Sequence, residues 1–222
     1  MYSPTMTDSQ LLKKDLFGEI WLIAAADEQY IVRDSSAASG WIRWLARRLL
    51  RREARVLAAL GDLTGVPPVR RIERDRLTRG YLPGAPMHRA KPRDPAYFKA
   101  AARLLRDLHR VGVVHNDLAK EPNLLVSENG SPAFIDFQLA WFAPQRGRLF
   151  RLLAYEDLRH LLKHKRSYCP QYLTRRELSI LDNPSLPSRA FRSTVKPVYM
   201  FVTRRLLGWS DREGASDRGD RG

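Results

Sequence analysis

Residues 41–60 have a helical periodic pattern that is interrupted by a single acidic residue, and this pattern limits the fold more than any other feature. At 100° per residue, the arginines of this stretch gather on one half of the helical circumference and the apolar side chains on the other. The pattern therefore predicts an amphipathic helix over Trp41–Leu60, packed against a core. The arginines are Arg43, Arg47, Arg48, Arg51, Arg52 and Arg55, and the apolar side chains are Ile42, Leu45, Ala46, Leu49, Leu50, Val56, Leu57 and Leu60.

One acidic residue interrupts the apolar side of this helix. Glu53 falls in the middle of the apolar arc. Burial of a lone carboxylate is costly, and a cationic partner offsets that cost. We therefore expect Glu53 to pair with a cation from another element.

Short apolar segments surround the predicted helix. Ile20–Ala26 and Gln29–Arg33 flank a polar turn, as in a hairpin. Val69–Ile72 and Arg76–Leu82 predict two further strands. Residues 1 to about 10 show no pattern, and we expect a loose start there.

The second half of the chain has a helical pattern with a short hairpin inside it. The stretch 84–94 is expected to be irregular and to mark a boundary between two lobes. Pro95 suits the first turn of a helix, and Gly112 suits its end. Asn129-Gly130 predicts a hairpin turn. The expected helices are Pro95–Val111 and Leu149–His164, with further helical segments around Thr174–Leu181 and Pro197–Leu207, and the expected hairpin strands are Asn123–Val126 and Ala133–Phe137.

This order of elements predicts an α+β chain of two lobes. The N-terminal lobe is expected over residues 11–84 and the C-terminal lobe over 85–209. Residues 210–222 are rich in Asp, Arg, Gly and Ser, so we expect a disordered tail.

The charge of the chain points to anionic partners. The 222 residues contain 39 Lys and Arg against 24 Asp and Glu, a formal net charge of +15. Such a charge attracts nucleic acid, anionic lipid or phosphorylated saccharide. A nucleic-acid-binding protein is therefore one alternative, although the sequence has no helix-turn-helix, zinc or RNA-recognition signature.

Cysteine content and hydropathy bear on the compartment. Cys169 is the only cysteine, so no intrachain disulfide forms, which suits a reducing cytoplasm. The N-terminal residues lack the apolar stretch of a signal peptide, and the longest apolar runs are too short to cross a bilayer. We expect a cytoplasmic protein, soluble or peripheral at the inner face of the cytoplasmic membrane.

The residues with the clearest chemistry lie between the predicted helix and the hairpin. Asp117 and Asn123 belong to the segment 115–123, and Asp136 comes at the end of the hairpin. Phosphoryl transfer from ATP requires ligands for Mg²⁺, a carboxylate near the attacking hydroxyl, and cations at the phosphates. Mg²⁺ prefers oxygen ligands and takes few of them from protein. One Asn and two Asp in this arrangement supply such a set.

This segment resembles the catalytic loop and metal-binding motif of the protein-kinase-like superfamily. It looks closest to the small bacterial kinases related to lipopolysaccharide core kinases and RIO-type kinases. The resemblance covers roughly residues 20–157, and its specific part is residues 115–138. It implies a two-lobed kinase-like fold with a small β-rich N-terminal lobe and a reduced, mainly helical C-terminal lobe.

The resemblance also implies roles for individual residues. Asp117 would be the catalytic base that orients the acceptor hydroxyl, and Lys120 would reach the γ-phosphate. Asn123 and Asp136 would hold Mg²⁺, while His115 would brace the loop.

In the N-terminal lobe, the resemblance places Arg33 where the superfamily usually has the lysine that binds the α- and β-phosphates. Glu53 would be the helix partner of Arg33. Arginine and lysine are not interchangeable at such a site. Gly18 is the only glycine near the expected phosphate loop, and Gln138 replaces the glycine that usually follows Asp-Phe.

The function implied is that of an ATP- and Mg²⁺-dependent kinase. The acceptor would be a protein Ser/Thr hydroxyl or a sugar hydroxyl of the lipopolysaccharide core. The alternative is a pseudokinase that binds nucleotide or acts as a scaffold without turnover, because Arg33 replaces lysine.

Two further patterns have alternative interpretations. His160 and His164, with Asp157 on a similar face, could bind a metal or be ordinary helix residues. The arginine face of residues 41–60, with Trp41 and Trp44, suits either a solvated surface or docking to an anionic membrane.

Overall fold

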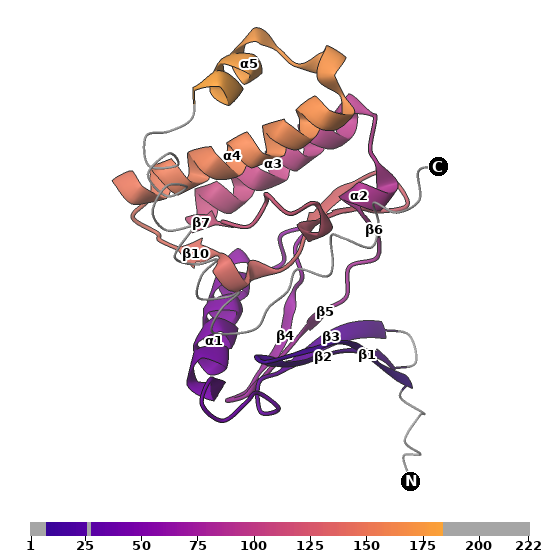
Figure 1. Cartoon of the computed structure of the whole chain (residues 1–222), viewed down its shortest axis with the longest axis vertical. Helices are drawn as coiled ribbons and strands as arrows, with labels where there is room; N and C mark the ends of the chain where they lie inside the picture. The colour runs from indigo at the N-terminus through magenta and orange to yellow at the C-terminus, as the bar shows by residue number, and fades with distance from the viewer. Residues whose placement is uncertain (1–7, 26–27, 184–222) are drawn as a thin grey trace. The chain divides into compact units, whose positions relative to one another are not determined.

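The computed structural model describes residues 8–25 and 28–183, and it begins with an antiparallel sheet (Figure 1). The five strands of this sheet lie in the order β1-β2-β3-β5-β4. Strand β3 is central, and pairs Arg33 with Ile20 of β2 and with Leu77 of β5. The strands are β1 Asp8–Asp15, β2 Gly18–Ala25, β3 Glu28–Asp34, β4 Val69–Ile72 and β5 Arg76–Gly80.

For residues 8–10, strand β1 corrects the expectation of a loose start, whereas residues 1–7 lie outside the described residues. Asp8 to Asp15 pair with β2, with an irregularity in register between Leu11 and Lys13. The side chains of β1 are largely exposed, so the strand has no apolar alternation to reveal it. Its pairing depends on backbone hydrogen bonds to β2, which the sequence pattern does not encode.

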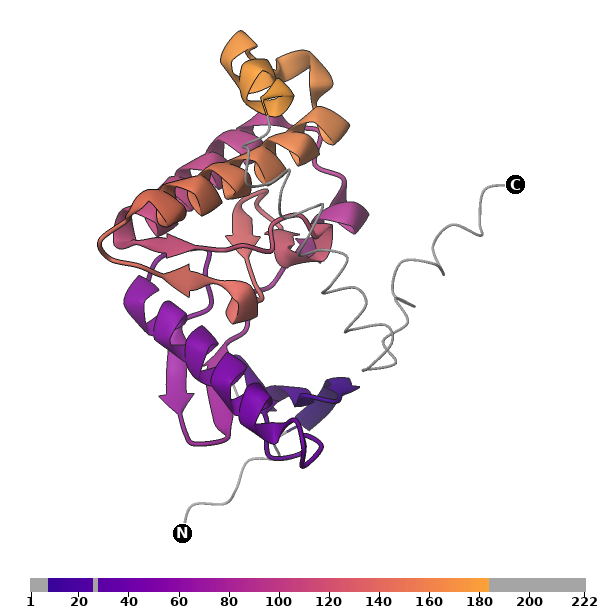
Figure 2. The same cartoon turned by 60° about the vertical axis from the view of Figure 1, so that its left-hand side comes forward.

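The predicted amphipathic helix is present as α1, Arg43–Leu60. It begins two residues later than expected, and the Ile42 N–H donates to the Ser39 carbonyl before it. Its buried side chains include most of the apolar arc, together with Ala54 and the fully buried Glu53. Helix α1 lies beside the sheet and beside strand β10 (Figures 1 and 2).

Helices α3 and α4 form the framework of the C-terminal part. Helix α3, Pro95–Val111, starts with the Asp94 carboxylate accepting from the Ala96 N–H at 2.8 Å. It ends at Gly112, which has a left-handed conformation with φ 93°. Helix α4, Arg148–Tyr168, packs along α3 (Figure 1). The predicted Pro95 start and Gly112 end are confirmed.

Two small sheets complete this part. Strands β6, β8 and β9 form one, and β7 pairs with β10 in the other. The elements not yet given are β6 Ala85–Pro86, α2 Met87–Ala90, β7 Val113–Val114, β8 Leu124–Val126, β9 Pro132–Phe134, β10 Trp141–Phe142 and α5 Arg175–Asp182, with 3₁₀ turns at Glu121–Asn123, Phe137–Leu139 and Pro170–Tyr172.

The stretch 84–94 is more regular than its sequence suggested. It contains β6 and α2, so the expectation of irregular structure was wrong there. The chain leaves the five-stranded sheet at Gly80 and joins the β6-β8-β9 sheet at Ala85. The helix expected around Pro197–Leu207 and the tail from 210 lie outside the described residues.

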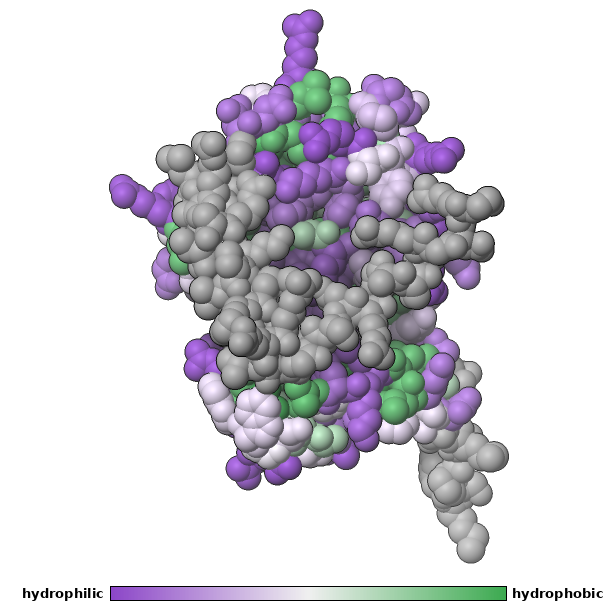
Figure 3. Space-filling view, viewed as in Figure 1, coloured by the Kyte–Doolittle hydropathy of each residue, from purple (hydrophilic) through white to green (hydrophobic). Residues whose placement is uncertain are grey.

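The α+β class is confirmed: an N-terminal antiparallel sheet is followed by a mainly helical part, as in a two-lobed kinase-like fold. Within residues 8–25 and 28–183, no helix is long and apolar enough to cross a membrane. Where described residues are visible in Figure 3, the surface is mainly hydrophilic and hydrophobic residues form separate patches.

Candidate active site

The loop after β7 brings Asp117, Lys120 and Asn123 into direct contact. The Asn123 Nδ2 donates to both the Asp117 carbonyl oxygen and Asp117 Oδ2, each at 2.9 Å. The Lys120 Nζ lies 2.9 Å from the same carboxylate oxygen. Asp117 and Asn123 are buried, whereas the Lys120 side chain is 60% exposed. The Oδ2 of Asp117 is therefore held by both an amide and an ammonium group.

Asp157 of α4 anchors this loop through hydrogen bonds to its backbone. Its carboxylate is buried and accepts from the His115 N–H at 2.7 Å and from the Asn116 N–H at 2.9 Å. Asn116 has φ +64°, a left-handed conformation that is costly outside glycine and must be held in place. Two charge-assisted hydrogen bonds to adjacent amides do so.

His115 connects the loop to the segment that carries Asp136. It is fully buried, and its Nε2 lies 3.0 Å from the Ile135 carbonyl oxygen. Its Nδ1 accepts from the Asp117 N–H at 3.3 Å, which makes Nε2 the protonated nitrogen and the donor to Ile135. The ring also packs against Phe137, with centroids 4.6 Å apart. These contacts are those expected of a bracing residue.

Asp136 comes close to Asn123 because strand β9, which precedes Asp136, pairs with strand β8, which follows Asn123. The Ile135 N–H donates to the Asn123 carbonyl at 3.0 Å. Strand β9 ends at Phe134, earlier than expected, and Asp136 has a left-handed conformation with φ 65°. Its Oδ1 is buried and has no hydrogen-bond partner within the described residues.

The oxygens of Asn123 and Asp136 suit a divalent cation. The Asn123 amide nitrogen is used by Asp117, so its Oδ1 is the atom left for a ligand. A buried carboxylate oxygen without a partner is costly, and a bound cation would satisfy it. Both groups are hard oxygen donors, so the residues present fit Mg²⁺.

Glu53 has the cationic partner that its position required. Its Oε2 accepts from Arg33 Nη1 at 3.0 Å, and the Arg33 and Glu53 side chains are 7% and 1% exposed. Arg79 of β5 lies on the other side, with its Nε 3.5 Å from Glu53 Oε1, too poorly aligned for a hydrogen bond. The carboxylate therefore lies between two arginines, and sequence reasoning missed the second.

Helix α1 also contacts the segment that follows Asp136. Arg52 Nε donates to the Ala140 carbonyl at 2.6 Å, and Arg52 Nη2 to the Leu139 carbonyl at 3.1 Å. The helix that positions Glu53 is thus bonded to the chain just beyond Asp136. Helix α1 therefore connects Arg33 of β3, through Glu53, to the segment that follows Asp136.

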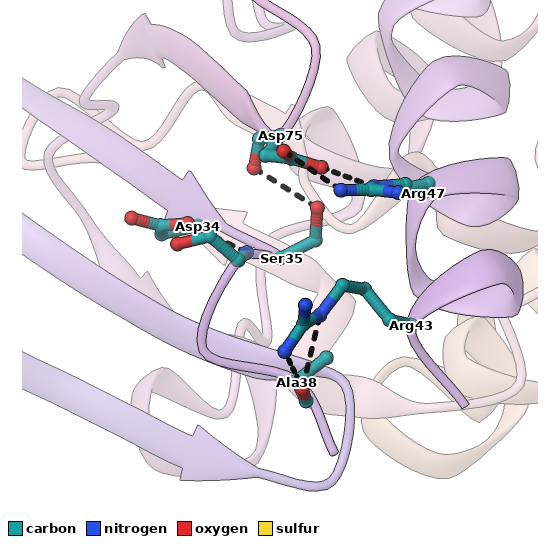
Figure 4. Close-up of polar contacts among 7 residues, drawn as sticks. Asp34, Ser35, Ala38, Arg43, Arg47 and Asp75 are labelled. Carbon is teal, nitrogen blue, oxygen red and sulfur yellow. Dashed lines mark hydrogen bonds and ion pairs between the residues drawn. The ribbon is translucent and has the colours of Figure 1, made fainter. Parts of the chain in front are cut away.

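Polar contacts hold the connection between β3 and α1 (Figure 4). The Ser35 Oγ and N–H both donate to the Asp75 carbonyl, at 2.9 and 2.8 Å. The Asp75 carboxylate accepts two bonds from Arg47, which lower the pKa of Asp75 and raise the pKa of Arg47. Arg43 donates to the Ala38 carbonyl. Arg43 and Arg47, like Arg52, thus support the fold.

Asp34, at the end of β3, is held in its charged form. Burial favours the neutral acid, but hydrogen bonds from the Ser36 N–H and from Arg76 outweigh it, and the pKa of Asp34 is lowered. Its carbonyl oxygen lies where a Cβ at Gly18 would come within 2.0 Å. Only glycine fits at position 18, where β2 begins after the turn. This turn is short and does not form a glycine-rich loop.

The metal site considered on α4 is not formed. Asp157 accepts from the backbone of the loop at residues 115–116, and His164 Nε2 bonds the Leu118 carbonyl at 2.8 Å. Among the residues that the structure describes, no three His, Cys, Asp or Glu cluster to hold a metal. His164 and Asp157 are structural residues of the helix.

Comparison with models of known protein families identifies the family of the chain. The model of the Phosphotransferase enzyme family (APH) matches residues 43–178, more than half of the chain. The chain belongs to this family. Membership places it in the protein-kinase-like superfamily and makes it a kinase-type transferase. A search of curated proteins gave no match.

The region matched to the Phosphotransferase enzyme family includes Glu53, Asp117, Asn123 and Asp136 but starts after Arg33. Asp157 also lies in it, and sequence reasoning had assigned that residue no role in the loop. The signal that found Glu53 was available for Asp157 as well, since it is a carboxylate on the buried face of a predicted helix, with Phe150, Leu161 and His164.

Proposed function

We propose that the chain transfers the γ-phosphate of ATP, with Mg²⁺, to a hydroxyl acceptor. The observation that carries this proposal is the pairing of Asn123 with Asp117 beside the unpartnered Asp136 oxygen. It unites a carboxylate for the acceptor with two oxygen ligands for a cation in one small region. Membership of a phosphotransferase family supports the same reaction class.

In this proposal, Asp117 accepts a hydrogen bond from the acceptor hydroxyl and orients it toward the phosphate. Asn123 Oδ1 and Asp136 hold the cation, which when bound neutralises charge on the phosphates. Asn123 also keeps Asp117 in place through its amide nitrogen. Asn123 therefore serves both the cation and the loop, whereas Asp136 serves the cation alone.

Arg33 is proposed to contact the α- and β-phosphates. Its Nη1 is bonded to Glu53, which fixes the guanidinium and leaves other N–H groups for a phosphate. Lys120 is proposed to move from Asp117 to the γ-phosphate when nucleotide binds. Its high exposure and position within bonding distance of Asp117 support this.

The acceptor is proposed to be anionic, because the chain has a formal net charge of +15. Protein Ser/Thr hydroxyls and lipopolysaccharide core sugars are the two classes to compare. The resemblance to RIO-type and lipopolysaccharide kinases covers roughly residues 20–157, and its specific part is residues 115–138. Transfer at the inner face of the cytoplasmic membrane would fit the second class.

The decisive experiment follows label from [γ-³²P]ATP into a cell extract split into protein and lipopolysaccharide fractions. We expect Asp117→Asn to reduce transfer by about 10²–10⁴-fold, with Mg²⁺-ATP affinity nearly unchanged. Asp107→Asn, an exposed acid of α3, is the matched control. Unchanged transfer in Asp117→Asn would show that another group orients the acceptor.

A pseudokinase is the second candidate, and the buried Arg33 in the position of a lysine favours it. Titration calorimetry with ATP, with and without Mg²⁺, separates the two. Nucleotide binding without transfer to either fraction would support the pseudokinase.

A further inference from the structure

An open cavity lies on the arginine face of α1, and nothing in the proposed reaction uses it. Its volume is about 820 Å³, within the range of pockets for small organic ligands. Four arginines of α1 line it, namely Arg48, Arg51, Arg52 and Arg55. No carboxylate lines it among the described residues.

The arginines of α1 other than Arg52 divide into two groups. Arg43 and Arg47 are bonded to the Ala38 carbonyl and to Asp75, on the side shown in Figure 4. Arg48, Arg51 and Arg55 make no ion pair or hydrogen bond within residues 8–25 and 28–183, and their side chains are exposed. These three cations, clustered without counter-ions, repel one another unless an anion is present.

Arg52 shows the effect of this crowding. Burial lowers the pKa of Arg52, and the neighbouring charge of Arg48 lowers it further. Its guanidinium is held by two carbonyl oxygens, which lack the full charge that would balance it. An anion in the cavity would relieve this repulsion.

Most of the remaining lining is apolar or aromatic, and much of it comes from the C-terminal part. Trp141 and Phe142 belong to β10, and Leu149 and Leu153 to the start of α4. Trp44 of α1 also contributes to the apolar lining. Figure 2 shows α1 below β10 and α4 on this side. A ligand with both an anionic and an apolar portion matches such a wall.

We propose that this cavity binds a phosphate monoester that carries an apolar organic group. Guanidinium groups match phosphate oxygens in a fork, which favours phosphate over a compact halide or an uncharged ligand. The arginines line a hollow with walls from two parts of the chain, which favours a small ligand over a flat membrane surface. The site is separate from the nucleotide and cation residues proposed above.

A bound ligand would bridge α1 and the C-terminal elements. Asn116, adjacent to Asp117, also lines the cavity, and its Nδ2 bonds the Leu139 carbonyl that Arg52 shares. Occupancy would therefore hold α1 against the loop that carries the proposed base.

Calorimetric titration with octyl phosphate, below its micelle concentration, tests the proposal. We expect one octyl phosphate per chain, about tenfold weaker binding of inorganic phosphate, and no binding of octyl glucoside. The double variant Arg48→Gln/Arg51→Gln is expected to weaken octyl phosphate binding by about tenfold or more. The control Arg103→Gln/Arg106→Gln removes two exposed arginines of α3 and should change binding by less than about twofold.

Several results would overturn the proposal. Equal weakening in both double variants would mean general attraction to a basic surface. Loss of binding when Mg²⁺-ATP is present would place octyl phosphate in the nucleotide site. Binding to vesicles containing phosphatidic acid, without binding to octyl phosphate, would show a membrane-docking face instead.

A measurement on the unaltered chain guards against misfolded variants. Arginine modification by phenylglyoxal is read by peptide mass spectrometry with and without octyl phosphate. We expect protection at Arg48, Arg51 and Arg55 and none at Arg103 and Arg106. Absence of selective protection would contradict the site even if the variants fail to fold.

Discussion

At the scale of the residue, the candidate site depends on a few buried charges that are paired across elements. Glu53 lies between Arg33 and Arg79, and Asp157 accepts from two adjacent amides of the loop that carries the proposed base. Each of these carboxylates would be costly without its partners. Their burial positions a β-strand, a helix and a loop relative to one another.

Replacement of Glu53 by Gln should be strongly destabilising. The change leaves two arginines facing a neutral amide, and loss of one partner of a buried pair costs about 3–5 kcal/mol. Glu73→Gln is the matched control, because Glu73 pairs with Arg71 at an exposed site and should cost under about 1 kcal/mol. The measurement is the free energy of unfolding in urea. Equal losses in the two variants would argue against a central role for the Glu53 pair.

At the scale of the element, tight turns and helix faces impose their own requirements. The turn between β1 and β2 brings the Gly18 backbone against the Asp34 carbonyl. Helix α4 buries titratable side chains along the face that supports the loop. Substitution of a single residue, Gly18 in the turn or His160 in α4, tests each of these features.

Gly18→Ala should disrupt the first hairpin. Gly18 has φ +125°, and a Cβ there would lie 2.0 Å from the Asp34 carbonyl oxygen. The backbone must shift, at a cost of about 1–3 kcal/mol or more. Gly40→Ala serves as control, since a Cβ at Gly40 meets nothing within 4 Å. Thermal unfolding should show a lower midpoint for Gly18→Ala alone; a shared midpoint would contradict the close approach.

The imidazole of His160 on α4 should make stability depend on pH. Burial, and then the charge of Lys163, lower the pKa of His160 to about 4 in the folded chain, against about 6.5 when unfolded. Between these values the unfolded chain binds a proton that the folded chain does not. Stability is therefore fully present above about pH 6.5 and falls as the pH drops toward 4.

We expect a loss of about 1 kcal/mol between pH 7 and pH 5, because solvent screens a partly buried imidazole. His160→Gln should remove that part of the pH dependence in urea unfolding. An identical pH profile in the variant would mean that other groups control stability over this range.

At the scale of the whole described molecule, α1 connects the N-terminal sheet to the C-terminal part. Arg52 bonds the two carbonyls of residues 139 and 140, immediately after the segment of Asp136. The same helix supplies Glu53 to Arg33. Movement of α1 would therefore disturb the proposed phosphate and cation residues together.

Arg52→Gln should loosen this connection. Loss of the two hydrogen bonds should cost about 1–2 kcal/mol and increase amide hydrogen exchange in residues 139–142 more than elsewhere. Arg106→Gln, on the exposed face of α3, should leave that exchange unchanged. Uniform exchange in Arg52→Gln and the control would mean that the contact does not hold the segment.

The resemblance of residues 115–138 located the candidate site, and periodicity located much of the fold. The apolar arc of residues 41–60 determined both α1 and the burial of Glu53, since a 3.6-residue period leaves one face for the core. Pro95 and Gly112 determined the ends of α3 through their backbone preferences. These are local properties, so they could be read without the fold.

Other features depended on contacts between distant residues. Strand β1 has exposed side chains, and only its backbone pairing with β2 makes it a strand. Arg79 and Asp157 took their roles from neighbours 26 and more positions away, across elements whose packing no local pattern specifies. The cavity on α1 likewise exists because β10 and α4 lie opposite its arginines. The sequence by itself determined which residues face a core and which chemistry is present; tertiary packing decided which charges are paired and which remain available for a ligand.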